Sequence, residues 1–233
     1  MSVFKFKAFN IHQAGATQKV GTDAMVLGAS LKFTSAKNIL DVGTGTGVIA
    51  LMLAQYNPSA EITGLDINSE TTKLADYNFK NSGFLNNFRV VNGDFLSYKP
   101  EHQFDLIVSN PPFFKTKMPS RNKLRSLARH EGEMTVEKLV LHATKLLTST
   151  GELWLILPQE RTDALLKFNE KLTLVKRIKI FGKPNHHVRD ILALSKENGS
   201  GVPEVTSLTI RNLKNEYTEA YKTLTKEFHF NKL

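Results

Sequence analysis

Residues 109–114 read Ser-Asn-Pro-Pro-Phe-Phe and form the most chemically specific run in the chain. Because a proline restricts its own backbone and that of the residue before it, Pro111 and Pro112 predict a stiff corner with Asn110 held extended. The amide oxygen of Asn110 and the carbonyl oxygen of Pro111 could then accept the two hydrogens of an exocyclic amine. With both hydrogens held, the nitrogen lone pair would point at an electrophile, and the rate would come from orientation and electrostatics.

Phe113 completes this predicted catalytic corner, because its ring offers a face on which a base lifted out of its stack could lie. The alternative is an ordinary Asn-Pro turn followed by a core phenylalanine. The position of the run at the end of a predicted strand, behind a second motif, favours the catalytic interpretation.

The second motif lies between a predicted strand and a predicted helix and is rich in glycine, which lets the backbone turn tightly and pass close to a ligand. It reads Asp41-Val42-Gly43-Thr44-Gly45-Thr46-Gly47. Asp66 ends the next predicted strand, nineteen residues after Gly47, where an acid can hold two ribose hydroxyls. Dinucleotide sites put a pyrophosphate at such a turn, and the carboxylate of Asp41 would repel it. A ligand with an ammonium and a sulfonium would suit that carboxylate, so the motif favours S-adenosylmethionine over NAD.

Two further segments extend the predicted cofactor site. Ile67 follows Asp66 directly, and Asp94 and Phe95 follow the third predicted strand. Asp94 could accept a hydrogen bond from the adenine amine, and the ring of Phe95 could lie on the adenine. A turn aspartate is the alternative interpretation of Asp94, and the register of Asp94 with Asp41 and Asp66 favours the cofactor site.

Strands and helices alternate along the chain, which predicts an α/β fold with a mainly parallel sheet and helices on both faces. Strands are expected at 38–42, 61–67, 88–91, 104–108 and 153–157, helices at 48–56, 69–82, 135–147 and 161–171, and two late strands at 174–180 and 191–194. The connection between the late strands is too short for a crossover helix, so these two should be antiparallel.

The composition suits one folded domain without a membrane span, since 41% of the 233 residues are hydrophobic and no run reaches the length of a spanning helix. The N-terminus lacks the apolar segment of a secretory signal, and the chain has no cysteine. These features predict a cytoplasmic protein without thiolate chemistry. The net charge is +9, with 9 Lys/Arg and 7 Asp/Glu in residues 1–100 against 22 and 15 in the rest. Such an excess favours a polyanionic partner.

A basic segment follows the catalytic corner, with no acid between residues 115 and 130. Its position predicts contact with the phosphates of a nucleic acid, and a solvated surface loop is the alternative. The predicted phosphate-binding residues are Lys115, Lys117, Arg121, Lys123, Arg125 and Arg129. Lys183, His186, His187 and Arg189 could add to the same surface, and the two histidines are interpreted as polar surface rather than as metal ligands.

The motifs from about residue 38 to 195 resemble those of the class I S-adenosylmethionine-dependent methyltransferases. The resemblance implies a Rossmann-like sheet of seven strands with the last one antiparallel. The Asn-Pro-Pro-Phe run resembles the signature of the amino-methyltransferases, which act on base amines or on a protein glutamine amide.

A closer resemblance adds residues 18–29 and the run Arg125-Ser126-Leu127-Ala128-Arg129-His130, and is to the bacterial tRNA adenine-N(6)-methyltransferases that modify valine tRNA beside its anticodon. It implies a tRNA substrate and places Thr22 and its neighbours over the methionine end of the cofactor. A helix cap explains Thr22 equally well.

The expected organisation is one structural domain, acting as a monomer without a metal. It comprises an N-terminal extension (1–37) that closes over the cofactor, a methyltransferase core (38–197) and a C-terminal tail (198–233) with one strand and one polar helix. Two alternatives stay open: a methyltransferase for a ribosomal guanine or a protein glutamine, and an RNA-binding protein that keeps the fold without catalysis.

Overall fold

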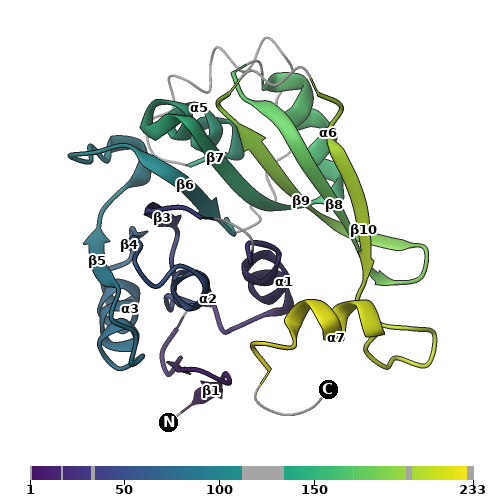
Figure 1. Cartoon of the computed structure of the whole chain (residues 1–233), viewed down its shortest axis with the longest axis horizontal. Coiled ribbons are helices and arrows are strands. Elements are labelled where there is room, and N and C mark those ends of the chain that lie inside the picture. The colour runs from purple at the N-terminus through teal and green to yellow at the C-terminus, as the bar shows by residue number, and fades with distance from the viewer. Residues whose placement is uncertain are drawn as a thin grey trace.

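The computed structural model describes residues 2–16, 18–32, 35–111, 134–169, 171–197 and 201–229. Its centre is an eight-stranded sheet with the strand order β10-β8-β9-β7-β6-β3-β4-β5. The strands are β3 (Asn38–Val42), β4 (Glu61–Asp66), β5 (Asn87–Asn92), β6 (Phe104–Ser109), β7 (Leu147–Pro158), β8 (Thr173–Lys183), β9 (His186–Ser195) and β10 (Glu204–Thr209). Figure 1 shows the sheet and the helices around it.

The predicted α/β architecture is confirmed, including the antiparallel pairing of the two late strands. β9 runs antiparallel to both β7 and β8, while every other pairing in the sheet is parallel. The late strands are longer than expected and are joined by a tight turn in which Asn185 has a positive φ of 62°.

The strand count differs from the seven expected, because β10 from the tail joins the sheet at its edge. It pairs in parallel with β8, from Glu204 opposite Lys176 to Thr209 opposite Phe181. Without β10 the backbone of β8 would be an open edge of the sheet, which proteins usually cover. Of the β10 side chains only Leu208 is buried, so the sequence gives little hydrophobic signal for this strand.

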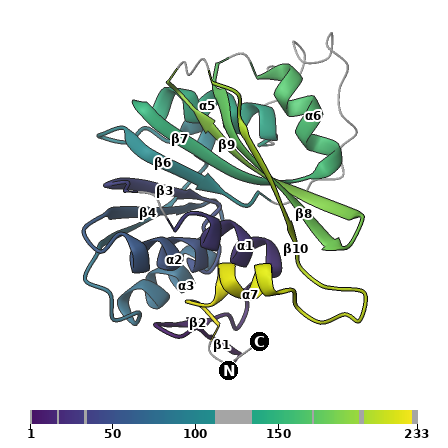
Figure 2. The same cartoon turned by 45° about the vertical axis from the view of Figure 1, so that its right-hand side comes forward.

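Helices cover both faces of the sheet, as Figure 2 shows. One face is packed by α1 (Thr22–Ser30), α2 (Val48–Tyr56), α3 (Ser69–Lys80) and α7 (Glu219–Thr225), and the other by α5 (Val136–Leu146), α6 (Gln159–Phe168) and the short 3-10 helix η1 (Phe95–Ser97). Each face has its own hydrophobic core. Ile39, Leu106 and Trp154 point to the first, and Leu40, Ile107 and Leu155 to the second. This alternation along each strand is what a sheet buried on both sides requires.

The two ends of the described chain meet beneath α1 and α2. A small antiparallel sheet of β1 (Val3–Lys5) and β2 (Asn10–His12), which the sequence did not predict, is bridged to the tail through Phe6 and His229. The rings of Phe6 and Phe9 stack with centroids 4.4 Å apart, and Phe228 meets Phe6 edge-on. The tail contains the expected strand and helix, and the proposed three-part division of the chain stays a prediction.

Within the part of the chain that the structure describes, no helix combines the length and the apolar character needed to cross a membrane.

Candidate active site

The register of the parallel strands brings the two main sequence motifs to one edge of the sheet. Val42, the last residue of β3, pairs with Leu65 of β4 on one side and with Ser109 of β6 on the other. The glycine turn that follows β3 therefore begins between Asp66 and Asn110. In open α/β sheets the ligand lies beyond this carboxyl edge, so the structure places both motifs where a ligand would bind.

The glycine turn adopts a backbone that glycine permits and other residues resist. Gly43, Gly45 and Gly47 all have positive φ, at 70°, 57° and 80°. At Gly47, the N-cap of α2, an added Cβ would also lie 2.5 Å from Cε1 of the Phe79 ring. Both the dihedral angle and the packing thus require glycine at this position.

The carboxylate of Asp66 is held in place by main-chain donors. Its Oδ2 accepts a hydrogen bond of 3.0 Å from the N–H of Gly45, and its Oδ1 accepts one of 3.0 Å from the N–H of Asn68. Each carboxylate oxygen has a second lone pair, so both can still accept a hydroxyl from a ligand. Ile67 beside it is 72% exposed, an unusual position for a large apolar side chain and one open to a flat ring.

Asp41 is buried beneath the glycine turn. Its Oδ2 accepts hydrogen bonds from the Thr44 hydroxyl at 2.8 Å and from the Ala50 N–H at 3.3 Å. Burial, with a smaller contribution from the nearby charge of Asp66, raises the pKa of Asp41 to about 7, and the two hydrogen bonds act in the opposite direction. Its Oδ1 is buried and makes no hydrogen bond to any residue that the structure describes. A buried carboxylate oxygen without a donor is the group that a cationic ligand would satisfy.

The structure places Asp94 and Phe95 differently from each other. Asp94 is exposed and caps η1, with its Oδ1 accepting from the Leu96 N–H at 3.0 Å, so its second oxygen remains open to solvent. Phe95 is only 2% exposed, and its ring packs edge-on against His142 with centroids 4.9 Å apart. A ring buried in the core leaves no open face, which argues against the predicted stacking of Phe95 on an adenine.

Asn110 is half-buried at the end of β6, and its side chain makes no hydrogen bond to the described residues. Ser109 before it is fully buried and donates to the Val42 carbonyl at 2.8 Å, which ties the end of β6 to the start of the glycine turn. Pro111 is buried. Pro112, Phe113 and the six predicted phosphate-binding residues of 115–129 lie outside the described residues.

An ion pair holds the N-terminus of α1 at the carboxyl edge of the sheet. Asp23 forms an ion pair with Arg189 of β9, with Oδ2 and Nε 3.0 Å apart. Thr22 is the first residue of the helix, the N-cap is Gly21, and no side chain caps the helix. The alternative interpretation of Thr22 as the helix cap is therefore wrong. Thr22 is exposed beside this ion pair.

Asn78 is a site-building residue that sequence reasoning missed. It is fully buried on α3, where its Oδ1 accepts from the His12 N–H at 2.9 Å. Its Nδ2 donates to the carbonyls of His12 and of Thr46, at 3.0 and 2.9 Å. One amide thus joins the N-terminal β1–β2 sheet to the glycine turn. An asparagine in a helix interior is a weak signal for such a role, because it is a poor helix former.

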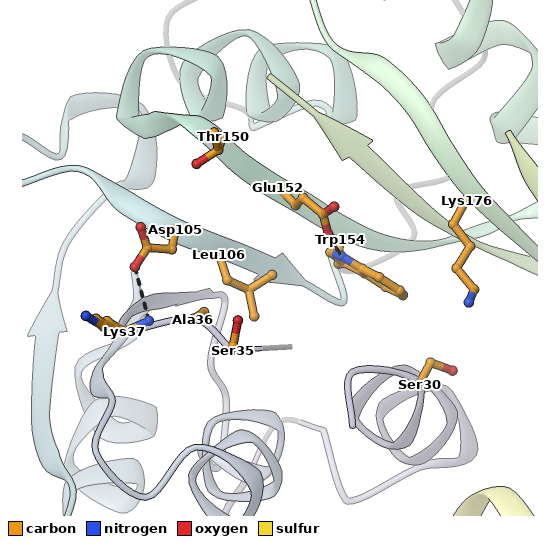
Figure 3. Close-up of a pocket in the computed structure, with 10 residues that line it drawn as sticks. All are labelled: Ser30, Ser35, Ala36, Lys37, Asp105, Leu106, Thr150, Glu152, Trp154 and Lys176. Atoms are coloured by element: carbon orange, nitrogen blue, oxygen red, sulfur yellow. Dashed lines mark hydrogen bonds between the residues drawn. The ribbon is translucent and has the colours of Figure 1, made fainter. Parts of the chain in front are cut away.

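A cavity of about 630 Å³ lies at the opposite edge of the sheet, near the starts of β6 and β7 (Figure 3). Both of its carboxylates and the ammonium of Lys176 are already engaged within the protein. Asp105 accepts from the N–H groups of Lys37 and Asn38, Glu152 accepts from the Trp154 indole at 2.7 Å, and Lys176 pairs with Glu204. The carboxyl edge therefore remains the candidate active site.

Comparison with known proteins shows the family of this chain. The family model described as methyltransferase small domain matches residues 14–181. A protein from a Flavobacteriaceae bacterium named tRNA1(Val) (adenine(37)-N6)-methyltransferase is 36% identical over 98% of this chain and 99% of its own length. A protein of the same name from Actinobacillus pleuropneumoniae is 39% identical over 98% and 97%.

This chain belongs to the tRNA1(Val) (adenine(37)-N6)-methyltransferase family. S-adenosylmethionine is therefore its cofactor, in agreement with the carboxylates of Asp41 and Asp66 at the glycine turn. Asp41 with its buried free oxygen fits a cationic ligand, and Asp66 with its fixed carboxylate fits a ribose.

Solved structures show the fold that members of this family share with other methyltransferases. A predicted O-methyltransferase from Agrobacterium tumefaciens has a TM-score of 0.67 at 19% identity, covering 88% of this chain and 96% of its own. The N-methyltransferase NodS from Bradyrhizobium japonicum, in complex with S-adenosyl-L-homocysteine, has a TM-score of 0.56 at 17% identity, covering 74% and 84%.

Among the described residues, no three or more histidine, aspartate or glutamate side chains are grouped so that they could hold a metal ion.

Proposed function

We propose that this chain transfers a methyl group from S-adenosylmethionine to the exocyclic 6-amino group of an adenine in tRNA, near the anticodon. The names of its full-length relatives support the substrate. The observation that carries the chemistry is the pairing of Val42 with Ser109, because it sets Asn110 directly beside the glycine turn. The amide of Asn110 makes no hydrogen bond to the residues that the structure describes, which leaves it available as a substrate-binding group in this proposal.

In this proposal the cofactor binds along the carboxyl edge of the sheet. The ribose hydroxyls bind the carboxylate of Asp66, the adenine lies by Ile67 with its amine near Asp94, and the cationic methionine end is balanced by Asp41. The main chain at Phe95, rather than its buried ring, lines the adenine end. The remaining cofactor-binding residues proposed are Thr22, Gly43, Gly45, Gly47 and Asn110.

Asn110 and Pro111 orient the target amine. The Asn110 side-chain oxygen accepts one amine hydrogen and the Pro111 carbonyl the other, which directs the lone pair of N6 toward the methyl group. When bound, S-adenosylmethionine would supply a methyl group whose bond to sulfur breaks as the bond to N6 forms. The positive charge passes to N6, which makes its proton acidic enough to be lost to water, so no strong base is required. Pro112 keeps the corner stiff and Phe113 stacks on the flipped adenine.

The basic residues of 115–129 bind tRNA phosphates, and a single chain contributes every group named, so a monomer is sufficient. A tRNA substrate sets the activity in the cytoplasm.

The raised pKa of Asp41 predicts that cofactor binding depends on pH. Its pKa of about 7 means that the carboxyl group is partly protonated at neutral pH, and a nearby cation would lower that pKa. Cofactor binding at pH 7 should therefore release a fraction of a proton, and affinity should rise with pH by up to about tenfold per unit below the pKa. Calorimetry in two buffers of different ionisation enthalpy measures the proton release.

The Asp41→Asn variant is the control, because it separates the protons released by Asp41 from those released by the cofactor's own amine. Proton release should be smaller in Asp41→Asn than in the unmodified protein. Equal release in the two proteins would show that Asp41 does not sense the cofactor. Without cofactor, the raised pKa means that stability falls as pH rises from about 4 through 7, and Asp41→Asn should flatten that fall.

The proposed activity is tested by methyl transfer from labelled cofactor to bulk tRNA, followed by nucleoside analysis of the product. We expect N(6)-methyladenosine as the labelled nucleoside. Labelled N(2)-methylguanosine from ribosomal RNA, or label in protein glutamine, would replace the tRNA substrate with one of the alternatives. Cofactor binding without transfer to any of these would favour an RNA-binding protein that keeps the fold.

A further inference from the structure

The hairpin of β8 and β9 extends beyond the rest of the sheet at the carboxyl edge. The last β7 residue, Pro158, pairs with Arg189, whereas β8 and β9 continue to pair as far as Lys183 and His186. Because β6 and β7 are parallel neighbours in the same sheet, this projecting turn lies on the side of the molecule that holds Asn110. Figure 2 shows the hairpin reaching past its neighbours.

The chain that leaves β10 runs beside this turn. Ile210 donates to the Phe181 carbonyl at 2.8 Å and Arg211 to the Gly182 carbonyl at 3.1 Å, which extends the parallel pairing past the end of β10. We call residues 183–187 and 211–217 together the basic arm. Within it the guanidinium of Arg211 lies 4.0 Å from the centre of the Tyr217 ring.

The basic arm presents cations to solvent. Lys183, His186 and Lys214 are exposed, and neither lysine makes an ion pair with any residue that the structure describes. Its one acid is Glu216, which is hydrogen-bonded to the Asn212 amide at 2.8 Å. The arm is therefore a positively charged surface.

The root of the hairpin is fixed by a buried charge network. Asp190 is fully buried and accepts hydrogen bonds from Nε and Nη2 of Arg177 at 3.0 and 2.9 Å. His187 lies 3.1 Å from the same carboxylate and stacks on Phe181, with ring centroids 5.0 Å apart. A fixed root means that little conformational entropy is lost when the tip binds a partner.

We propose that the basic arm binds the sugar-phosphate backbone of the tRNA at a distance from the target nucleotide, an inference that rests on the proposed function. A folded tRNA is wide enough to extend from the catalytic corner across the carboxyl edge, and its phosphates are the ligands that unpaired lysines bind by releasing counterions. Such contacts set position and affinity and carry no base specificity.

The test compares two double variants with the same change in charge. Lys183→Gln with Lys214→Gln removes the exposed cations of the arm. Lys99→Gln with Lys145→Gln removes two exposed lysines that line a shallow groove beside η1 and α5, at the amino side of the sheet. Binding to purified tRNA is measured at several salt concentrations, together with kcat, KM for tRNA and the Kd of the cofactor.

The arm variant should bind tRNA about tenfold more weakly and show a salt slope shallower by about 2, because each lost phosphate contact removes about one unit of slope. The kcat and the cofactor Kd should not change, and Lys183→Arg with Lys214→Arg should restore binding. Equal tRNA binding and equal slopes in the arm variant and the control would overturn the inference while methylation continues. Absence of tRNA methylation by the unmodified protein would instead overturn the proposed function.

Discussion

Asn110→Ala is expected to lower kcat for tRNA methylation by about 10²–10³-fold, the loss seen when one preorganised polar contact to a reacting group is removed. The Kd of the cofactor should rise far less than kcat falls, because Asn110 is one of several proposed cofactor contacts and its amide makes no hydrogen bond to the described residues of the glycine turn. The residue is half-buried, so the shortened side chain should not unfold the protein. Single-turnover methyl transfer separates the chemical step from substrate binding.

Two further variants sharpen this expectation. Asn110→Asp keeps an acceptor oxygen at the same position and should retain part of the activity that alanine loses. Asn87→Ala, at the first residue of β5 and the opposite end of the sheet, makes the same substitution where no chemistry is proposed, and kcat should not change. If Asn110→Ala turned over at the unmodified rate, the amide would have no part in orienting the amine.

The candidate site was largely predictable from the sequence because it depends on parallel strands. Once 38–42, 61–67 and 104–108 are taken as neighbouring parallel strands, their carboxyl ends must share an edge. Asp66 and Asn110 each end or follow a strand, so they had to meet the glycine turn. The observed register, with Val42 between Leu65 and Ser109, is what that argument required.

The parts of the fold that were not predicted depend on contacts between residues distant in sequence. β10 carries only one buried side chain, so its place in the sheet comes from main-chain pairing to β8 and not from a hydrophobic pattern. The β1–β2 sheet is held by aromatic packing against Phe228 and by the amide of Asn78. Phe95 was expected to face a ligand because of its neighbour Asp94, yet the 3-10 turn after Asp94 directs its ring into the core.

The ion pair of Asp23 and Arg189 is a direct contact between the N-terminal extension, which was expected to take part in the site, and the sheet. It joins residues 166 positions apart, and it fixes the first turn of α1 to β9 only a few residues from the hairpin turn that belongs to the basic arm. The cofactor end and the tRNA end of the proposed site thus share one structural support. A surface ion pair contributes little stability by itself, so this pair matters mainly for position.

Asp66→Ala is expected to weaken cofactor binding by about two orders of magnitude while leaving the fold intact. Hydrogen bonds to a charged group contribute about 1.5–3 kcal/mol each, and about 1.4 kcal/mol changes Kd tenfold. The variant also frees the Gly45 N–H, which the Asp66 carboxylate now holds at 3.0 Å. Asp76→Ala on α3 is the matched control, since the interaction of Asp76 with the described part of the chain is an exposed ion pair with Lys80.

The ribose contact can be separated from the support of Gly45 by changing the ligand as well as the protein. S-adenosylhomocysteine and its 2′-deoxy form differ by one hydroxyl, and the unmodified protein should bind the deoxy form more weakly. In Asp66→Ala that difference should shrink, because the group that accepts the hydroxyl is gone. The amount by which it shrinks measures the coupling between the Asp66 carboxylate and the ribose hydroxyl. Calorimetric titration of both ligands against both proteins gives the four constants. If the deoxy form were disfavoured equally in the two proteins, Asp66 would support the turn without touching the ribose.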